Sequence, residues 1–140
     1  MNLIPAKVKN IENIENLNIV SFDFAGKLIE FVSLELTNVS LEQDVILGLK
    51  PFHLSVAKNI KGSLSCQNQL NAKLEDIDKG KLLSSLGFSC RGIKLQSIIT
   101  TKKLNEMDLK KGEVLTLLIE ASNLFLAEQN KAEKKECKNA

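Results

Sequence analysis

The sequence contains the same order of short segments twice, and this internal repeat constrains the fold more than any other feature. PAKVKNI at residues 5–11 matches NAKLEDI at residues 71–77, with Ala, Lys and Ile at equivalent positions and Val8 opposite Leu74. Two more pairs follow in the same order, FVSLELT with KLQSIIT and ILGLKPFHLSVA with LTLLIEASNLFLA. The unit is longer than the roughly 20–50 residues of solenoid repeats, so it indicates two copies of one small domain.

Each copy has the pattern of several short β-strands. Residues 19–36 alternate apolar and other side chains around a turn at Ala25-Gly26-Lys27, and KLLSSLGF and GIKLQSIIT do the same in the second half. The polar segment TKKLNEMDLKKGE has only Leu104 and Leu109 as apolar anchors, which predicts a short helical turn and a loop. Short strands with little helix are typical of a five-stranded barrel of OB type.

We therefore predict an all-β fold of two tandem small five-stranded OB-type β-barrels with short helical turns. The first repeat is expected at residues 1–61 and the second at residues 62–128, followed by a disordered, highly charged C-terminal tail at residues 129–140. Barrels of this size are marginal alone. Association of chains into a homo-oligomer, a dimer or a trimer, is therefore expected to help bury their apolar faces.

Composition excludes several classes of partner and compartment. The net charge is only +2 and the chain has six Phe but no Trp or Tyr, which disfavours a nucleic-acid surface. No apolar run approaches the roughly 18 residues of a membrane span, and the N-terminus lacks the apolar core of a secretory signal. Cys66, Cys90 and Cys137 are too few and too dispersed for a disulfide framework or a CxxC metal site. A cytoplasmic location is the simplest expectation.

The sequence shows no constellation typical of catalysis. No nucleophile–base pair, carboxylate dyad or phosphate loop stands out, and Asp23 and Glu30 lie on expected strands without a paired acid. His53 is the single histidine and has no carboxylate or cysteine at ligand spacing, so it is expected at a surface or interface. We predict that the chain is not an enzyme and holds no metal ion and no organic cofactor.

The repeated segments resemble those of the molbindin family, the Mop or TOBE domains that bind molybdate and tungstate. The family pattern runs S-A-R-N-x-L, I-T-x-x-S, L-G-L-x-x-G-x-x-V and K-A-S-x-V-x-L-A. Its counterparts here cover about residues 3–127 and are Ser65–Leu70, Ile99-Thr100, Asp108–Val114 and Glu120–Ala127 in the second half, and Leu36–Ser40 and Lys50–Leu54 in the first. A tandem pair is similar to the ligand-binding half of the molybdate-responsive transcription regulator, whose helix-turn-helix portion has no room here.

The resemblance implies a reversible oxyanion site at an interface between domains. Molybdate is a tetrahedral dianion with four acceptor oxygens, so it needs convergent hydroxyl and N–H donors and about one fixed cation. In the family these donors come from S-A-R-N, from the Thr and Ser of I-T-x-x-S, and from the Lys of the closing block. The bound ligand is thus expected to be molybdate or tungstate.

Departures from the pattern indicate how the site is assembled. The first half lacks the S-x-x-N lip, while in the second half Lys103 replaces the Ser and Glu120 replaces the Lys, where a carboxylate repels a dianion. Gln67 replaces the Arg, and Cys66 replaces the Ala but still offers its N–H. Combining both halves completes one donor set, which we predict to be Thr37, Ser40, Lys50, Ser65, Cys66 and Gln67, with Asn68, Thr100 and Ser122 as weaker candidates.

These residues also have ordinary structural interpretations. Threonine is common at strand ends, which would account for Thr37 and Thr100. Lys50 would ordinarily be a solvated lysine, and Ser65 with Asn68 would form a turn through side-chain-to-backbone hydrogen bonds.

Two functional hypotheses from different classes follow. The first is a cytoplasmic protein that binds molybdate or tungstate for storage, buffering or sensing. The alternative is a regulatory or interaction module, either a detached sensor domain or an accessory of a molybdate transporter, with weak or lost oxyanion binding. A third hypothesis, an OB-type nucleic-acid binder, is disfavoured by the scarcity of aromatic residues.

Overall fold

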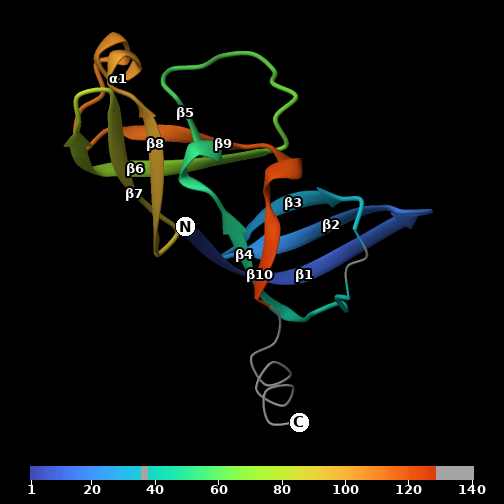
Figure 1. Cartoon of the computed structure of the whole chain (residues 1–140). Coiled ribbons are helices and arrows are strands. Elements are labelled where there is room, and N and C mark those ends of the chain that lie inside the picture. Colours follow the sequence, from blue (N-terminus) through green and yellow to red (C-terminus); the bar gives the residue numbers. More distant parts are fainter. Residues whose placement is uncertain (36–37, 129–140) are drawn as a thin grey trace. The chain divides into compact units, whose positions relative to one another are not determined.

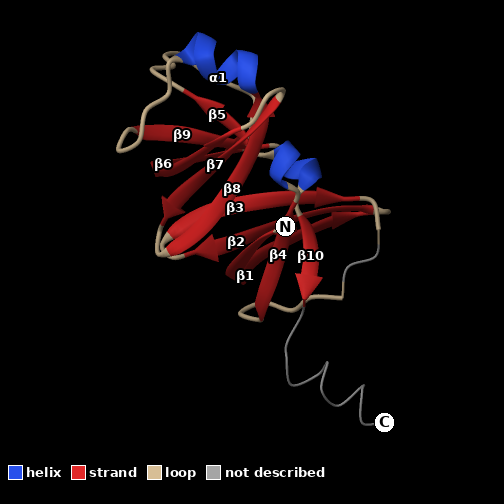
Figure 2. Ribbon diagram, turned by 60° about the vertical axis from the view of Figure 1, so that its left-hand side comes forward, coloured by secondary structure: helices blue, strands red, loops and turns tan. Residues whose placement is uncertain are grey.

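Nearly all regular structure in this chain is β-strand, as a computed structural model covering residues 1–35 and 38–128 shows (Figures 1 and 2). The strands form two five-stranded sheets, and α1 (Thr101–Met107) is the only α-helix among the described residues. These features confirm the predicted all-β class with two small five-stranded domains. The predicted tail at 129–140 lies outside the described residues. No helix in the described part of the chain is long and apolar enough to cross a membrane.

One compact unit, here called the β1 unit, comprises Leu3–Gly48 and the described residues from Ala121 onward. Its sheet has the order β10-β4-β1-β2-β3, and its neighbouring strands β1/β2, β2/β3 and β10/β4 are antiparallel. The elements are β1 (Asn2–Ile14), β2 (Leu17–Phe24), β3 (Lys27–Ser33), β4 (Asp44–Leu49), the 3₁₀ turn η2 (Ala121–Asn123) and β10 (Phe125–Glu128).

The second compact unit, here called the β6 unit, comprises Met1–Asn2 and Leu49–Glu120. Its sheet has the order β5-β9-β6-β7-β8. The elements are the 3₁₀ turn η1 (Pro51–His53), β5 (Ser55–Ala57), β6 (Asn68–Lys79), β7 (Leu83–Cys90), β8 (Ile93–Thr100), α1 and β9 (Val114–Ile119).

The two units repeat one another in detail, which confirms the internal repeat. The N–H of Val8 donates to the carbonyl of Gln43 at 2.9 Å, and the N–H of the equivalent Leu74 donates to the carbonyl of Glu113 at 2.8 Å. The strand register shifts directly after Val8 in β1 and directly after Leu74 in β6, so both long strands carry a bulge at the same position. A bulge bends and twists a strand, which lets one long strand serve a curled sheet.

The last strand of each repeat joins the sheet of the other repeat. β5, from the first repeat, pairs with β9, and β10, from the second repeat, pairs with β4 (Figure 1). Each compact unit is therefore discontinuous in sequence. The boundaries at residues 61 and 62 describe the repeats along the chain and stay a prediction, and the exchange itself was not predicted.

Strand alternation produces each core. In β1 the even-numbered residues from Asn2 to Val8 are buried, and in β6 those from Asn68 to Leu74 are buried, as period-two patterning requires. In the β1 unit the rings of Phe22 and Phe31 meet edge to face, with centroids 5.1 Å apart. The register places Ser97 of the β6 unit where the β1 unit has Phe31, and the buried Ser97 hydroxyl donates to the carbonyl of Leu54 at 2.5 Å.

Lys58, just after the exchanged strand β5, caps the C-terminus of α1. Its ammonium donates to the carbonyls of Met107 at 3.2 Å and Asp108 at 3.0 Å, and it pairs with Glu113 at 3.1 Å. Cations stabilise helix C-termini because the last carbonyls lack helical partners. The backbone N–H of Lys110 and then Lys58 lower the pKa of the Glu113 carboxyl.

Replacing Lys58 with Met is expected to destabilise the protein by about 1–2 kcal/mol, because two helix carbonyls lose a charged donor. Lys102→Met is the matched control, since Lys102 is exposed on the same helix and forms no ion pair with a described residue. Because folding lowers the pKa of Glu113, its ionised carboxyl contributes stability at neutral pH. This contribution disappears as the pH falls and the carboxyl becomes protonated. Urea unfolding at neutral and acidic pH measures both effects. Equal midpoints for the two variants would contradict the capping role.

Candidate functional site

The segment Ser65-Cys66-Gln67, here called the lip, lies directly before β6. Ser65 and Gln67 are exposed, whereas Cys66 is buried. The Cys66 thiol donates to the carbonyl of Asn68 at 3.7 Å, and the Gln69 side chain donates to the carbonyl of Cys66 at 3.0 Å. These contacts fix the backbone of the lip and leave the side chains of Ser65 and Gln67 facing solvent.

Lys50 belongs to the same compact unit as the lip. It stands between β4 and η1, is exposed, and forms no ion pair with a described residue. Ser55 is opposite Leu118 in the β5/β9 pair, and Asn68 is opposite Ile119 in the β6/β9 pair. The segment before β5 and the lip before β6 therefore leave the sheet at the same end, where β9 finishes.

Glu120 also lies at this end of the sheet, directly after β9. Because Asn68 is opposite Ile119, Glu120 falls beside the lip. Burial first, and the negative charge of Glu120 second, raise the pKa of the Cys66 thiol. The end of the sheet thus carries one anionic residue, Glu120, beside the exposed polar groups of the lip.

The weaker candidates of the β6 unit have structural roles. Thr100 accepts a hydrogen bond from the N–H of Lys103 at 3.2 Å, so it is the N-cap of α1. It is opposite Leu83, at the end of the sheet where β6 finishes, away from the lip. Asn68 is buried, being only 2% exposed, at the first position of β6. The structure therefore does not bring Thr100 together with the lip.

The remaining candidates belong to the β1 unit or lie outside the described residues. Ser40 is exposed, and its N–H donates to the Gln43 side chain at 2.9 Å. Ser122 in η2 lines a groove of about 770 Å³ together with Phe31, Val32, Ser33, Leu34, Glu35, Asn38, Leu124, Phe125 and Leu126. This lining is mostly apolar and includes no cation, so it suits a dianion poorly. Thr37 is not among the described residues.

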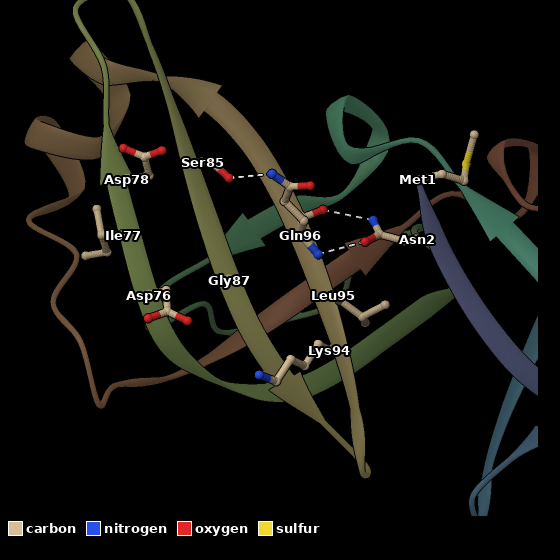
Figure 3. Close-up of a pocket in the computed structure, with 10 residues that line it drawn as sticks. All are labelled: Met1, Asn2, Asp76, Ile77, Asp78, Ser85, Gly87, Lys94, Leu95 and Gln96. Atoms are coloured by element: carbon tan, nitrogen blue, oxygen red, sulfur yellow. Dashed lines mark hydrogen bonds between the residues drawn. The ribbon is translucent and has the colours of Figure 1, made fainter.

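A second groove, of about 600 Å³, lies on the β6 unit and was not predicted (Figure 3). The Asn2 amide donates to the carbonyl of Gln96 at 2.8 Å and accepts from its N–H at 2.7 Å, while the Gln96 side chain donates to Ser85 at 2.6 Å. Asp76 and Asp78 line the groove with Lys94 as its only lysine, which disfavours an anion. Asn2 and Asn68 occupy equivalent positions in the two repeats, and this alignment was the sequence signal that Asn2 is buried.

The fold has a counterpart among solved structures over nearly the whole chain. No protein-family model and no curated protein matches the sequence. ModG is a cytoplasmic molybdate-binding protein, and one of its crystal structures has molybdate bound. That structure superposes on this chain with a TM-score of 0.81 at 19% sequence identity. The match covers 89% of this chain and 94% of the ModG chain. A molybdate-binding protein from Sporomusa ovata matches 43% of this chain and 90% of its own at 28% identity, with a TM-score of 0.42.

The fold defines a class of protein with two small Mop-like β domains in one chain. Within that class, the chain has the fold of a tandem molbindin, as the agreement with ModG over nearly the whole chain shows. This confirms the fold that the sequence resemblance implied.

Proposed function

We propose that this protein binds molybdate reversibly and acts in the cytoplasm as a store, buffer or sensor of the oxyanion rather than as an enzyme. The carrying observation is that the exposed Lys50 and the exposed lip belong to one compact unit of a chain with a tandem molbindin fold. ModG, which has this fold, is a cytoplasmic molybdate-binding protein. Tungstate is included in the proposal because it is also a tetrahedral dianion.

The donor set of the proposed site matches the needs of such a ligand. The Lys50 ammonium supplies the fixed cation, and the Ser65 hydroxyl, the Gln67 amide and the backbone N–H groups of the lip supply neutral donors. Thr37 and Ser40 complete the predicted set, with Asn68, Thr100 and Ser122 as weaker members. Oxyanion binding needs no covalent step and no organic cofactor. A homo-oligomer, a dimer or trimer, remains part of the proposal.

Replacing Lys50 with Ala is expected to weaken molybdate binding by about tenfold or more, because the site loses its cation. Lys102→Ala is the control, since it removes one exposed lysine of α1 and gives the same net charge. Calorimetric titration with molybdate and tungstate, with sulfate as a competitor, measures both variants. Equal affinities for the two variants would rule out Lys50 as the cation of the site.

The second candidate function is a regulatory or interaction module with weak or lost oxyanion binding. The carboxylate of Glu120 beside the lip favours it, because a negative charge opposes a dianion. Its partner would be a molybdate transporter or regulator. A folded wild-type protein that binds neither molybdate nor tungstate in the titration would support this function over the first.

A further inference from the structure

The two repeats differ in charge at one equivalent position. Lys50 follows β4 and precedes η1, and Glu120 follows β9 and precedes η2 in the same way. The chain therefore has one cationic and one anionic copy of this position. Both residues are exposed, and neither forms an ion pair with a described residue.

The backbone of Glu120 lies beside the lip, and its side chain is exposed. The β6/β9 register fixes its backbone beside Gln67, since Asn68 is opposite Ile119. Burial, and after it the negative charge of Glu120, raise the pKa of the Cys66 thiol in the lip. This register belongs to the β6 unit itself, so strand pairing fixes the position of Glu120 at this end of the sheet.

A carboxylate in this position distinguishes oxyanions by their protons. Ionised carboxylates only accept hydrogen bonds. Molybdate and sulfate have no proton near neutral pH, so their oxygens and the Glu120 oxygens would be two sets of acceptors facing each other. Hydrogen phosphate has the same charge as sulfate near pH 8 but carries one O–H, which can donate to the carboxylate. The penalty for an unpaired acceptor is then replaced by a hydrogen bond.

We propose that Glu120, beside the lip, is the specificity-determining residue of the oxyanion site. Its carboxylate opposes oxyanions that carry no proton and accepts a hydrogen bond from those that carry one. This inference rests on the oxyanion site of the proposed function. It implies that the wild-type protein binds molybdate more weakly than its other donors would permit. It also implies that hydrogen phosphate competes better than sulfate does.

The test is a calorimetric titration near pH 8 of wild type, Glu120→Gln, Glu120→Lys and the control Glu75→Gln with molybdate, sulfate and inorganic phosphate. Glu75 is exposed on β6, so its substitution changes the net charge equally. Glu120→Gln is expected to tighten molybdate and sulfate binding about tenfold or more and to leave phosphate nearly unchanged or weaker. Glu120→Lys is expected to tighten molybdate further, and Glu75→Gln to change nothing.

The outcomes separate this inference from the proposed function. Wild-type binding of molybdate that depends on Lys50 but not on Glu120 overturns the inference and leaves the function standing. Molybdate binding by Glu120→Gln but not by wild type supports the inference and overturns the function. An equal gain for all three oxyanions shows simple charge repulsion and overturns the proton selectivity. Folded variants that bind no oxyanion overturn both.

Discussion

Truncating the chain after Asn123 is expected to unfold the β1 unit while the β6 unit stays folded. The deletion removes β10, which pairs with β4, and the buried Leu124. It also uncovers Gly48, over which the Phe125 ring lies. β4 then becomes the edge strand of the sheet, which loses the β10/β4 backbone hydrogen bonds and exposes a template for aggregation. The β6 unit keeps all five of its strands because β5 comes from the first repeat.

Hydrogen–deuterium exchange read by mass spectrometry measures this effect for each unit separately. Amides of β1 to β4 are expected to lose protection, and amides of β6 to β9 to keep it. Truncation after Glu128 is the matched control, because it retains β10. Protection of β1 to β4 that is equal in both truncated proteins would show that β10 contributes little to this sheet.

Most of the fold was predictable because both repeats follow local rules. Alternation predicted the strands, Ala25-Gly26 and Arg91-Gly92 form the hairpin turns, and Leu104 and Leu109 are buried around the predicted helical turn. The strand exchange was not predictable in this way. The strands that receive β10 and β5 are VILGL in β4 and LTLLI in β9, which offer the same apolar pattern. Alternation therefore cannot tell which of the two sheets a short strand joins.

The candidate site was predictable to a smaller extent. The departure at Glu120 was visible in the sequence, but its place beside the lip depends on a cross-strand register that only the fold provides. Thr100 has the residue type of a ligand, yet it also matches the N-cap of a helix, and the structure shows that it has this second role. Asn2 was missed because its only signal was its alignment with Asn68 of the second repeat, and the local sequence around Asn2 gives none.

Replacing Phe22 with Ala is expected to cost about 3–5 kcal/mol, the range for a fully buried phenylalanine. Phe22 is 0% exposed, and its ring packs edge to face against Phe31. The cavity would lie at the centre of the β1 unit, where the deletion also removes the aromatic contact. A loss of this size is a large fraction of the roughly 5–15 kcal/mol that stabilises an ordinary domain. Phe22→Ala should therefore leave the β1 unit only marginally folded.

Urea denaturation followed by far-ultraviolet circular dichroism is the suitable measurement, because the chain has no Trp or Tyr to report unfolding by fluorescence. Phe52→Ala is the control, since Phe52 is 61% exposed in η1 and its truncation should change stability little. Phe88→Ala makes the equivalent deletion in the β6 unit, where the partner of the aromatic pair is replaced by Ser97. Its cost should be lower by the edge-to-face term, about 0.5–1.5 kcal/mol. Equal losses for Phe22→Ala and Phe88→Ala would show that the Phe22–Phe31 contact adds nothing beyond burial.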